Sequence, residues 1–183
     1  MTIIPTAIDG LFEVAHSRFT DNRGLFERFF CATALAPILK ERRIVAVNHS
    51  KTASVGALRG LHYQMPPHAE MKLVCCLRGS VHDVAIDIRQ GSPTFLRHHA
   101  TLLTGDNARM IAIPEGFAHG FQVLEPDSEL LYLHTAPYAP ESERGLAWND
   151  PRLAIPWPGP VTDISRRDEG HAVIDDGFQG VPA

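Results

Sequence analysis

An antiparallel β-sandwich or barrel is the fold class that the sequence predicts. Short apolar or alternating runs recur at regular spacing in the middle of the chain, and turns rich in Gly, Pro, Asp and Asn separate them. Only one segment has convincing helical spacing, so the class is all-β, and eight strands in this arrangement fit a jelly roll best. The predicted strands are Ile44–His49, Ala57–His62, Met71–Cys76, Ser80–Ile88, His99–Leu103, Arg109–Ile113, His119–Leu124 and Glu129–His134.

The N-terminal segment carries further regular structure. Leu11–Ser17 alternates apolar and polar residues as a strand does, and a turn at Asp21–Gly24 leads into Leu25–Phe30, which predicts a hairpin. Cys31–Arg43 has apolar residues at helical spacing and ends on cations that complement a helix C-terminus. This segment is the predicted helix, with a break expected near Pro37.

The length of 183 residues predicts a single domain that is large enough to bury a substantial core. We expect N-terminal strands and a helix over residues 1–43 and a jelly-roll core over 44–138. Proline becomes frequent after Tyr138, so residues 139–183 are expected to wrap the core as loops and short helical turns.

Composition disfavours several functional classes. Hydrophobic residues make up 44% and charged residues 21%, which is typical of folded proteins, and the net charge of -4 gives no basic excess for nucleic acid or a membrane surface. No apolar run is long enough to span a bilayer and the first residues do not resemble a secretory signal, so we expect a cytoplasmic protein. The odd number of cysteines predicts reduced packing residues rather than a disulfide framework: Cys31, Cys75 and Cys76.

A histidine and a lysine form the first candidate pair for chemistry. His62 lies at the end of a predicted strand, just before a Pro-Pro turn, where side chains point into the mouth of a barrel. Such a histidine is usually structural when it stands alone, and a lone lysine is usually a surface cation. Because Lys72 opens the next strand, and an ammonium beside an imidazole is costly to bury, the pair indicates a hydrated cavity that binds anions.

Two further side chains have alternative interpretations. His119 lies at another predicted strand end between two glycines, where it serves a site or caps a turn. Tyr132 lies among apolar residues, where it is a functional phenol or a core tyrosine with a bonded hydroxyl. Three arginines in or beside turns are candidates for binding phosphate, although most surface arginines have no such role: Arg23, Arg59 and Arg167.

Metal binding is a separate possibility for jelly rolls of this kind. They often bind iron or manganese through a His-x-His pair with a later Glu and His, and that pair is missing here. His98 and His99 are adjacent, so they point to opposite faces of a strand. A site built from His62, His119 and an acid stays open as an alternative.

Seven short motifs in order, between about Asp21 and Asp168, resemble the dTDP-4-dehydrorhamnose 3,5-epimerase family. The resemblance implies a cupin jelly roll, a homodimer, no metal or other cofactor, and a dTDP-4-keto-6-deoxyhexose as the nucleotide-sugar substrate. The motifs are Asn48–Ser50, Leu58–Gln64, Lys72–Val74, Asp83–Arg89, Gly91–Phe95, Ile113–Phe121 and Trp148–Pro151.

The resemblance also implies roles for individual residues. A ketone at C4 acidifies the hydrogens on C3 and C5, so the reaction needs a base, a cation for the enolate oxygen, and an acid on the opposite ring face. His62 resembles the family's base, Lys72 its cation and Tyr132 its acid. Asp168 matches the carboxylate that orients the base, and Asp83 is expected to support the site. The residues expected to contact the nucleotide sugar are Arg23, Asn48, Arg59, His119, Tyr138, Glu143 and Arg167.

The chain also departs from the family pattern. Arg28 stands where a glutamate is common, Ala46 and Val47 replace two polar residues, and Pro137 replaces a tyrosine. These changes touch the nucleotide and sugar pocket and leave the expected base, cation and acid in place. An epimerase acting at C3 alone, or on another nucleotide-linked 4-keto sugar, therefore stays open. A sugar-nucleotide-binding cupin without catalysis is disfavoured because base and acid are both present.

Overall fold

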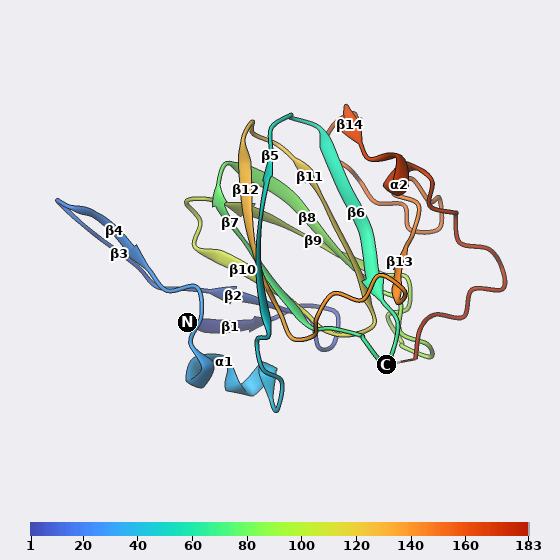
Figure 1. Ribbon diagram of the computed structural model, residues 1–183, viewed down its shortest axis with the longest axis horizontal. Helices are drawn as coiled ribbons and strands as arrows, with labels where there is room; N and C mark the ends of the chain where they lie inside the picture. The colour runs from blue at the N-terminus through green and yellow to red at the C-terminus, as the bar shows by residue number, and fades with distance from the viewer. Residues whose placement is uncertain (183) are drawn as a thin grey trace.

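Two mostly antiparallel sheets packed face to face form the body of the computed structural model, which describes residues 1–182 (Figure 1). The first sheet has the order β1 (Thr2–Pro5), β2 (Phe12–Ala15), β10 (Arg109–Ile113), β7 (Lys72–Arg78), β12 (Ser128–His134) and β5 (Ala46–Thr52). The second sheet has the order β13 (Glu143–Gly145), β6 (Ala57–Gln64), β11 (Phe117–Val123), β8 (Ser80–Asp87) and β9 (His98–Thr104). All eight predicted strands are present to within a few residues, and the all-β jelly-roll prediction is confirmed.

Each sheet buries side chains on both faces. The inner faces meet in a core that includes Val74, Cys76 and Phe121, while Leu73 and Cys75 point out of the first sheet into a second cluster beneath the helix. This alternation follows from the period of two along a strand. Burial raises the pKa of Cys75 to about 12 and that of Cys76 to about 11, so the two thiols are packing residues, as expected.

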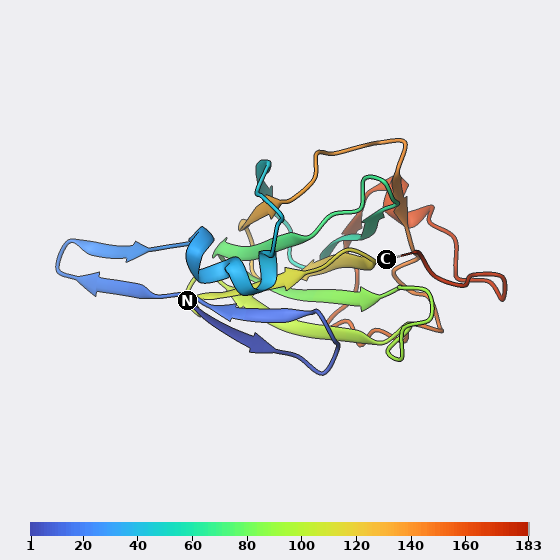
Figure 2. The ribbon, with the colours of Figure 1, turned by 90° about the horizontal axis from the view of Figure 1, so that it is seen from below.

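The N-terminal hairpin differs from the prediction. Its strands are β3 (Arg18–Asp21) and β4 (Gly24–Glu27), and it projects well away from the two sheets (Figure 2). Leu11–Ser17 was wrongly expected to be its first strand: β2 in this segment instead pairs with β10 on one side and with β1 on the other. Burial of Val14 beneath the helix favours that pairing over a free hairpin.

The predicted helix is shorter than expected. The helix α1 covers Ala32–Leu39 and continues through Pro37, where a break was expected. It ends at Lys40, whose positive φ of 54° stops the helical path. Arg42, expected in the last turn, instead forms two bonds of 2.6 and 2.7 Å with Glu115 outside the helix. No helix within residues 1–182 is long and apolar enough to cross a membrane.

The C-terminal segment covers the outer face of the second sheet and adds elements that position the site. Leu146, Leu153 and Ile174 pack against this face. The short strands β13 and β14 (Asp163–Ile164) both pair with β6, and the helix α2 (Arg166–Glu169) follows β14 directly. The expected wrap of loops and short helical turns is therefore accompanied by two strand segments.

A buried carboxylate at the end of β8 gives a stability prediction. Burial by itself would raise the pKa of Asp87, but hydrogen bonds from Arg89, Ser92 and Thr94 to the ionised form outweigh burial and lower the pKa from 3.8 to about 2. The resulting stabilisation is complete above about pH 4 and is lost as the pH falls towards 2. We expect Asp87→Asn to lower the free energy of unfolding by about 2 kcal/mol at pH 7.

Urea unfolding at pH 7 and at pH 3 checks this expectation. The difference between wild type and Asp87→Asn should shrink at pH 3, whereas exposed Asp176→Asn should behave as wild type at both. An Asp87→Asn deficit of the same size at both pH values would contradict the assigned titration.

Candidate active site

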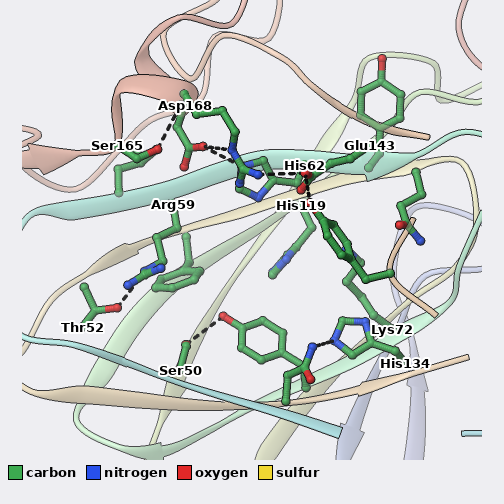
Figure 3. Close-up of a pocket in the computed structure, with 18 of the residues that line it drawn as sticks. Ser50, Thr52, Arg59, His62, Lys72, His119, His134, Glu143, Ser165 and Asp168 are labelled. Carbon is green, nitrogen blue, oxygen red and sulfur yellow. Dashed lines mark hydrogen bonds and ion pairs between the residues drawn. The ribbon is translucent and has the colours of Figure 1, made fainter. Parts of the chain in front are cut away.

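A pocket of about 680 Å³ opens between the two sheets along β5 and β6, and residues of β14 and α2 contribute to its lining (Figure 3). Its volume suits a ligand of nucleotide-sugar size. Ten of the twelve predicted site residues line it: Asn48, Arg59, His62, Lys72, His119, Tyr132, Tyr138, Glu143, Arg167 and Asp168. The pocket therefore gathers residues from distant parts of the chain.

His62 and Asp168 form a hydrogen-bonded pair on the wall made by the second sheet. His62 Nε2 lies 2.9 Å from Asp168 Oδ1, and the backbone N–H of Gly60 donates to Asp168 Oδ2 at 3.1 Å. Burial alone would raise the pKa of Asp168, but these bonds and the neighbouring imidazole hold it well below its usual range. The nearer partner of Nε2 is this carboxylate, which only accepts, while Arg167 Nη2 lies further away at 3.2 Å, so the proton of a neutral His62 resides on Nε2 and the lone pair on Nδ1.

Local backbone structure positions both His62 and Asp168. Ser165 accepts from the N–H of Asp168 at 3.1 Å and caps α2, which orients the carboxylate towards β6. On β6, a bulge at Gly60 places Arg59 and His62 on the same face, although alternation would separate residues three apart. Gly60 has a φ of 126°, and an added Cβ would lie 2.6 Å from the Cα of Gly120. Glycine is therefore required here.

Lys72 supplies a buried ammonium on the opposite, first sheet. Its Nζ lies 3.0 Å from Glu70 Oε1, and both side chains are largely buried. The second oxygen of Glu70 accepts from His134 Nδ1 at 2.7 Å. Burial by itself raises the pKa of Glu70, but these partners outweigh it and lower that pKa below its ordinary value. The ammonium of Lys72 therefore lies in the pocket beside a fixed negative charge, the carboxylate of Glu70.

Tyr132 lies on β12 of the same sheet and lines the pocket. The hydroxyl is 3.2 Å from Ser50 Oγ, and the ring packs against the core between the sheets. Burial raises the pKa of Tyr132 well above its ordinary value, and Ser50 offsets only part of this effect. The phenol therefore keeps its proton at neutral pH and is available as an acid.

His119 is fixed by Asp83, which lies behind it. His119 Nε2 is 2.9 and 3.0 Å from the two oxygens of Asp83, and both residues are buried. His119 lines the pocket, whereas Asp83 does not, so Asp83 acts on a bound molecule only through His119. The expectation that Asp83 supports the site remains a prediction of an indirect role.

The pocket rim carries the remaining polar groups. Arg59 donates to Thr52 Oγ1 at 3.0 Å, a neutral partner that leaves the guanidinium charge uncompensated there. Arg167 donates to Glu143 at 2.8 Å, and the same carboxylate accepts from Tyr138 at 2.7 Å. Arg59 in the middle of β6 corrects the expectation that it stands in or beside a turn.

Arg23 lies outside this pocket. It is at the tip of the β3–β4 hairpin, its side chain is 84% exposed, and it pairs with Asp21. Within a single chain, Arg23 therefore does not contact a molecule in the pocket. The prediction that Arg23 contacts the nucleotide sugar is wrong for the pocket of its own chain. Ala46 and Val47, which depart from the family pattern, lie on β5, but neither lines the pocket.

The structure places the two histidines of the alternative metal site with different acids. His62 and His119 are bonded to different carboxylates, so they do not form the expected group with one acid. Among residues 1–182, the ligand atoms that gather within 4.8 Å of one another belong to His62, Asp168 and His171. Arg167 contacts both His62 and Asp168, which places a cation beside this group.

Several pocket residues were not predicted. A signal existed for His134, because it lies two residues after Tyr132 and therefore shares its face of β12. Alternation from Asn48 likewise reaches Ser50 and Thr52 on β5. Glu70 lies two residues before Lys72 and just outside the strand, and the tertiary fold brings it to His134.

A histidine on an aspartate, a buried ammonium and a protonated phenol, gathered in one pocket of a cupin jelly roll, define the class of protein as a carbohydrate epimerase, an isomerase that works by moving protons. A family model described as dTDP-4-dehydrorhamnose 3,5-epimerase matches residues 5–176. The chain belongs to this family.

Individual relatives agree with this assignment. A dTDP-4-dehydrorhamnose 3,5-epimerase of Shigella flexneri is 40% identical over 96% of this chain and 97% of its own. The structure of a dTDP-6-deoxy-D-glucose-3,5-epimerase of Legionella pneumophila with dTDP-4-keto-L-rhamnose matches with a TM-score of 0.91 and 41% identity, covering 99% and 97% of the two chains. A 3′-monoepimerase of Streptomyces bikiniensis with dTDP-quinovose matches with a TM-score of 0.86 and 30% identity, covering 93% and 86%.

Proposed function

We propose that the protein inverts both C3 and C5 of a dTDP-4-keto-6-deoxyhexose through enolate intermediates. The observation that carries this proposal is that His62 and Tyr132, which both line the pocket, lie on opposite sheets. A sugar ring between the sheets has a base on one face and an acid on the other, which is what inversion requires. The Legionella pneumophila relative holds a 4-keto sugar of this kind.

Each inversion consists of two proton transfers. His62 Nδ1 removes the proton from C3, the C–H electron pair forms the C3–C4 double bond, and the C4 carbonyl becomes an oxyanion. The ammonium of Lys72 stabilises this oxyanion. Tyr132 then donates its proton to C3 from the opposite face, the carbonyl re-forms, and exchange with solvent returns the proton from His62 to Tyr132. The same sequence at C5 completes the reaction.

The rim groups bind the nucleotide in this proposal. Arg59, whose hydrogen-bond partner Thr52 is neutral, offers its remaining N–H groups to the diphosphate. Tyr138 is exposed at the rim and presents a ring face for the base, while its hydroxyl is held by Glu143. Asn48 and His119 then contact the sugar from the walls.

Product analysis by proton NMR tests the substrate. dTDP-4-keto-6-deoxyglucose should give a product whose ring coupling constants show inversion at C3 and C5, and the UDP analogue should react more slowly. Inversion at C3 alone would assign a 3-epimerase, as in the Streptomyces bikiniensis relative. Binding without any turnover would favour the non-catalytic cupin.

We also infer that the working form is a homodimer. The projecting hairpin exposes Phe19, Leu25 and Phe26 at 65%, 59% and 62%, an unusual concentration of apolar surface on two strands. A second copy is the proposed partner, since a symmetric dimer would cover both hairpins at once and would bring Arg23 of one subunit to the pocket of the other. This arrangement reconciles the predicted substrate contact of Arg23 with its distance from its own pocket.

Light scattering and complementation test the dimer. The chain should have twice its mass of 20.2 kDa in solution, and Phe19→Glu combined with Phe26→Glu should give monomers. A mixture of Arg23→Ala and His62→Ala chains should recover about a quarter of wild-type activity, because half of the dimers are mixed and each contains one intact site. Recovery no greater than the sum of the separate variants would contradict a site shared between subunits.

We further infer a cytoplasmic location. All three cysteines, Cys31, Cys75 and Cys76, are free thiols in the structure. Free thiols are typical of proteins in reducing compartments, which supports this inference. Fractionation of the native host with an antibody against the protein should place it with cytoplasmic markers.

A further inference from the structure

A carboxylate and a histidine stand behind the ammonium of Lys72. Glu70 Oε1 lies 3.0 Å from Lys72 Nζ, and Glu70 Oε2 accepts from His134 Nδ1 at 2.7 Å. The side chain of Glu70 is only 9% exposed and that of His134 16%. Both residues line the pocket, and neither takes part in the proposed proton transfers.

The backbone fixes the two residues relative to each other. In the register of β7 and β12, His134 lies opposite Lys72. One residue further, Thr135 Oγ1 accepts from the N–H of Met71 and donates to its carbonyl, both at 2.9 Å. These two bonds at Met71 therefore fix the segment that carries Glu70 and Lys72 to the end of β12.

The hydrogen bonds also determine the orientation of the histidine. Asn48 Nδ2 donates to His134 Nε2 at 3.2 Å, so Nε2 accepts and the proton of the neutral ring resides on Nδ1, facing Glu70. The ring of His134 stacks on that of Tyr132 with an interplanar angle of 17° and centroids 6.0 Å apart. The imidazole of His134 thus contacts both Glu70, which holds the cation Lys72, and Tyr132, the proposed acid.

We propose that His134 is a positioning residue: by holding Glu70, it fixes the ammonium of Lys72 where the enolate oxygen forms. With one oxygen bound to His134, Glu70 meets Lys72 through the other oxygen alone, and the remaining N–H groups of the ammonium stay available to the substrate. Without His134, Glu70 is free to turn into the pocket, where its charge would oppose the developing oxyanion. The inference rests on the proposed function, in which Lys72 stabilises the enolate.

Three substitutions test the proposal in the full-length protein with dTDP-4-keto-6-deoxyglucose. His134→Ala should lower kcat about tenfold or more with KM changed much less, since the loss affects the transition state. His134→Asn should recover much of this loss, because the asparagine amide donates from near the position of Nδ1. His99→Ala is the matched control: His99 bonds Glu13 at 3.0 Å on β9, outside the pocket, and its loss should leave kcat unchanged.

A second readout separates positioning of the cation from an effect on the acid. Enolate stabilisation precedes both hydrogen exchange and product formation, so His134→Ala should slow the two in the same proportion. Equal kcat for His134→Ala and wild type would overturn the inference and leave the proposed function standing. So would equal losses in His134→Ala and His134→Asn, or a loss that only follows the melting temperature. A wild-type protein inert on the substrate would instead overturn the proposed function and this inference together.

Discussion

His62→Ala should abolish exchange of the C3 hydrogen with solvent and, with it, epimerisation. His62 is the imidazole in the pocket that Asp168 holds with its lone pair on Nδ1, and removal of a general base lowers the rate by about 10²–10⁴-fold. The other pocket histidines are engaged differently, because His49 is bonded to Glu129, His119 to Asp83 and His134 to Glu70. None of them is expected to replace the base.

The measurement is the rate of loss of the H3 signal in deuterium oxide for wild type and variant. Titration with dTDP provides the control, since the nucleotide should bind His62→Ala as well as wild type when the pocket is intact. Exchange at the wild-type rate in a variant that binds dTDP normally would remove His62 from the role of base.

Tyr132→Phe should separate hydrogen exchange from product formation. The substitution keeps the ring that packs in the core and stacks on His134, and it removes only the hydroxyl that is bonded to Ser50. Proton removal by His62 continues, but the enolate no longer receives a proton from the opposite face. We expect epimerised product to form about 10²-fold more slowly or worse, while exchange falls far less.

Both rates come from one NMR time course, in which deuterium entering with retained configuration is distinguished from deuterium in the inverted product. Ser50→Ala provides a matched comparison, because it removes the partner of the hydroxyl and leaves the phenol in place. Equal loss of exchange and product in Tyr132→Phe would show that the tyrosine acts before proton return or serves only the structure.

Much of the fold was predictable because strands in a jelly roll leave strong local signals. Alternation and turn residues located all eight central strands, and Arg109–Ile113 was predicted without error. The N-terminal part was predicted less well. Whether Phe12–Ala15 pairs with a hairpin neighbour or with β10 depends on contacts almost a hundred residues away, which no local pattern encodes.

The site shows the same division between local and tertiary information. His62, Lys72, Tyr132 and Asp168 were identified through a resemblance to known sequences, and the structure brings them into one pocket. Arg59 shares a face of β6 with His62 because of a bulge, whereas simple alternation would place the two side chains on opposite faces. Glu70 and His134 meet only through the register of two strands some sixty residues apart in the chain.

Hydrogen exchange at both carbons is the most direct test of the central claim that this pocket forms an enolate on either side of a C4 ketone. In deuterium oxide, dTDP-4-keto-6-deoxyglucose incubated with the wild-type protein should lose the H3 and H5 signals as a new L-configured product appears. Retention of both signals at enzyme concentrations that bind the sugar nucleotide would contradict the account.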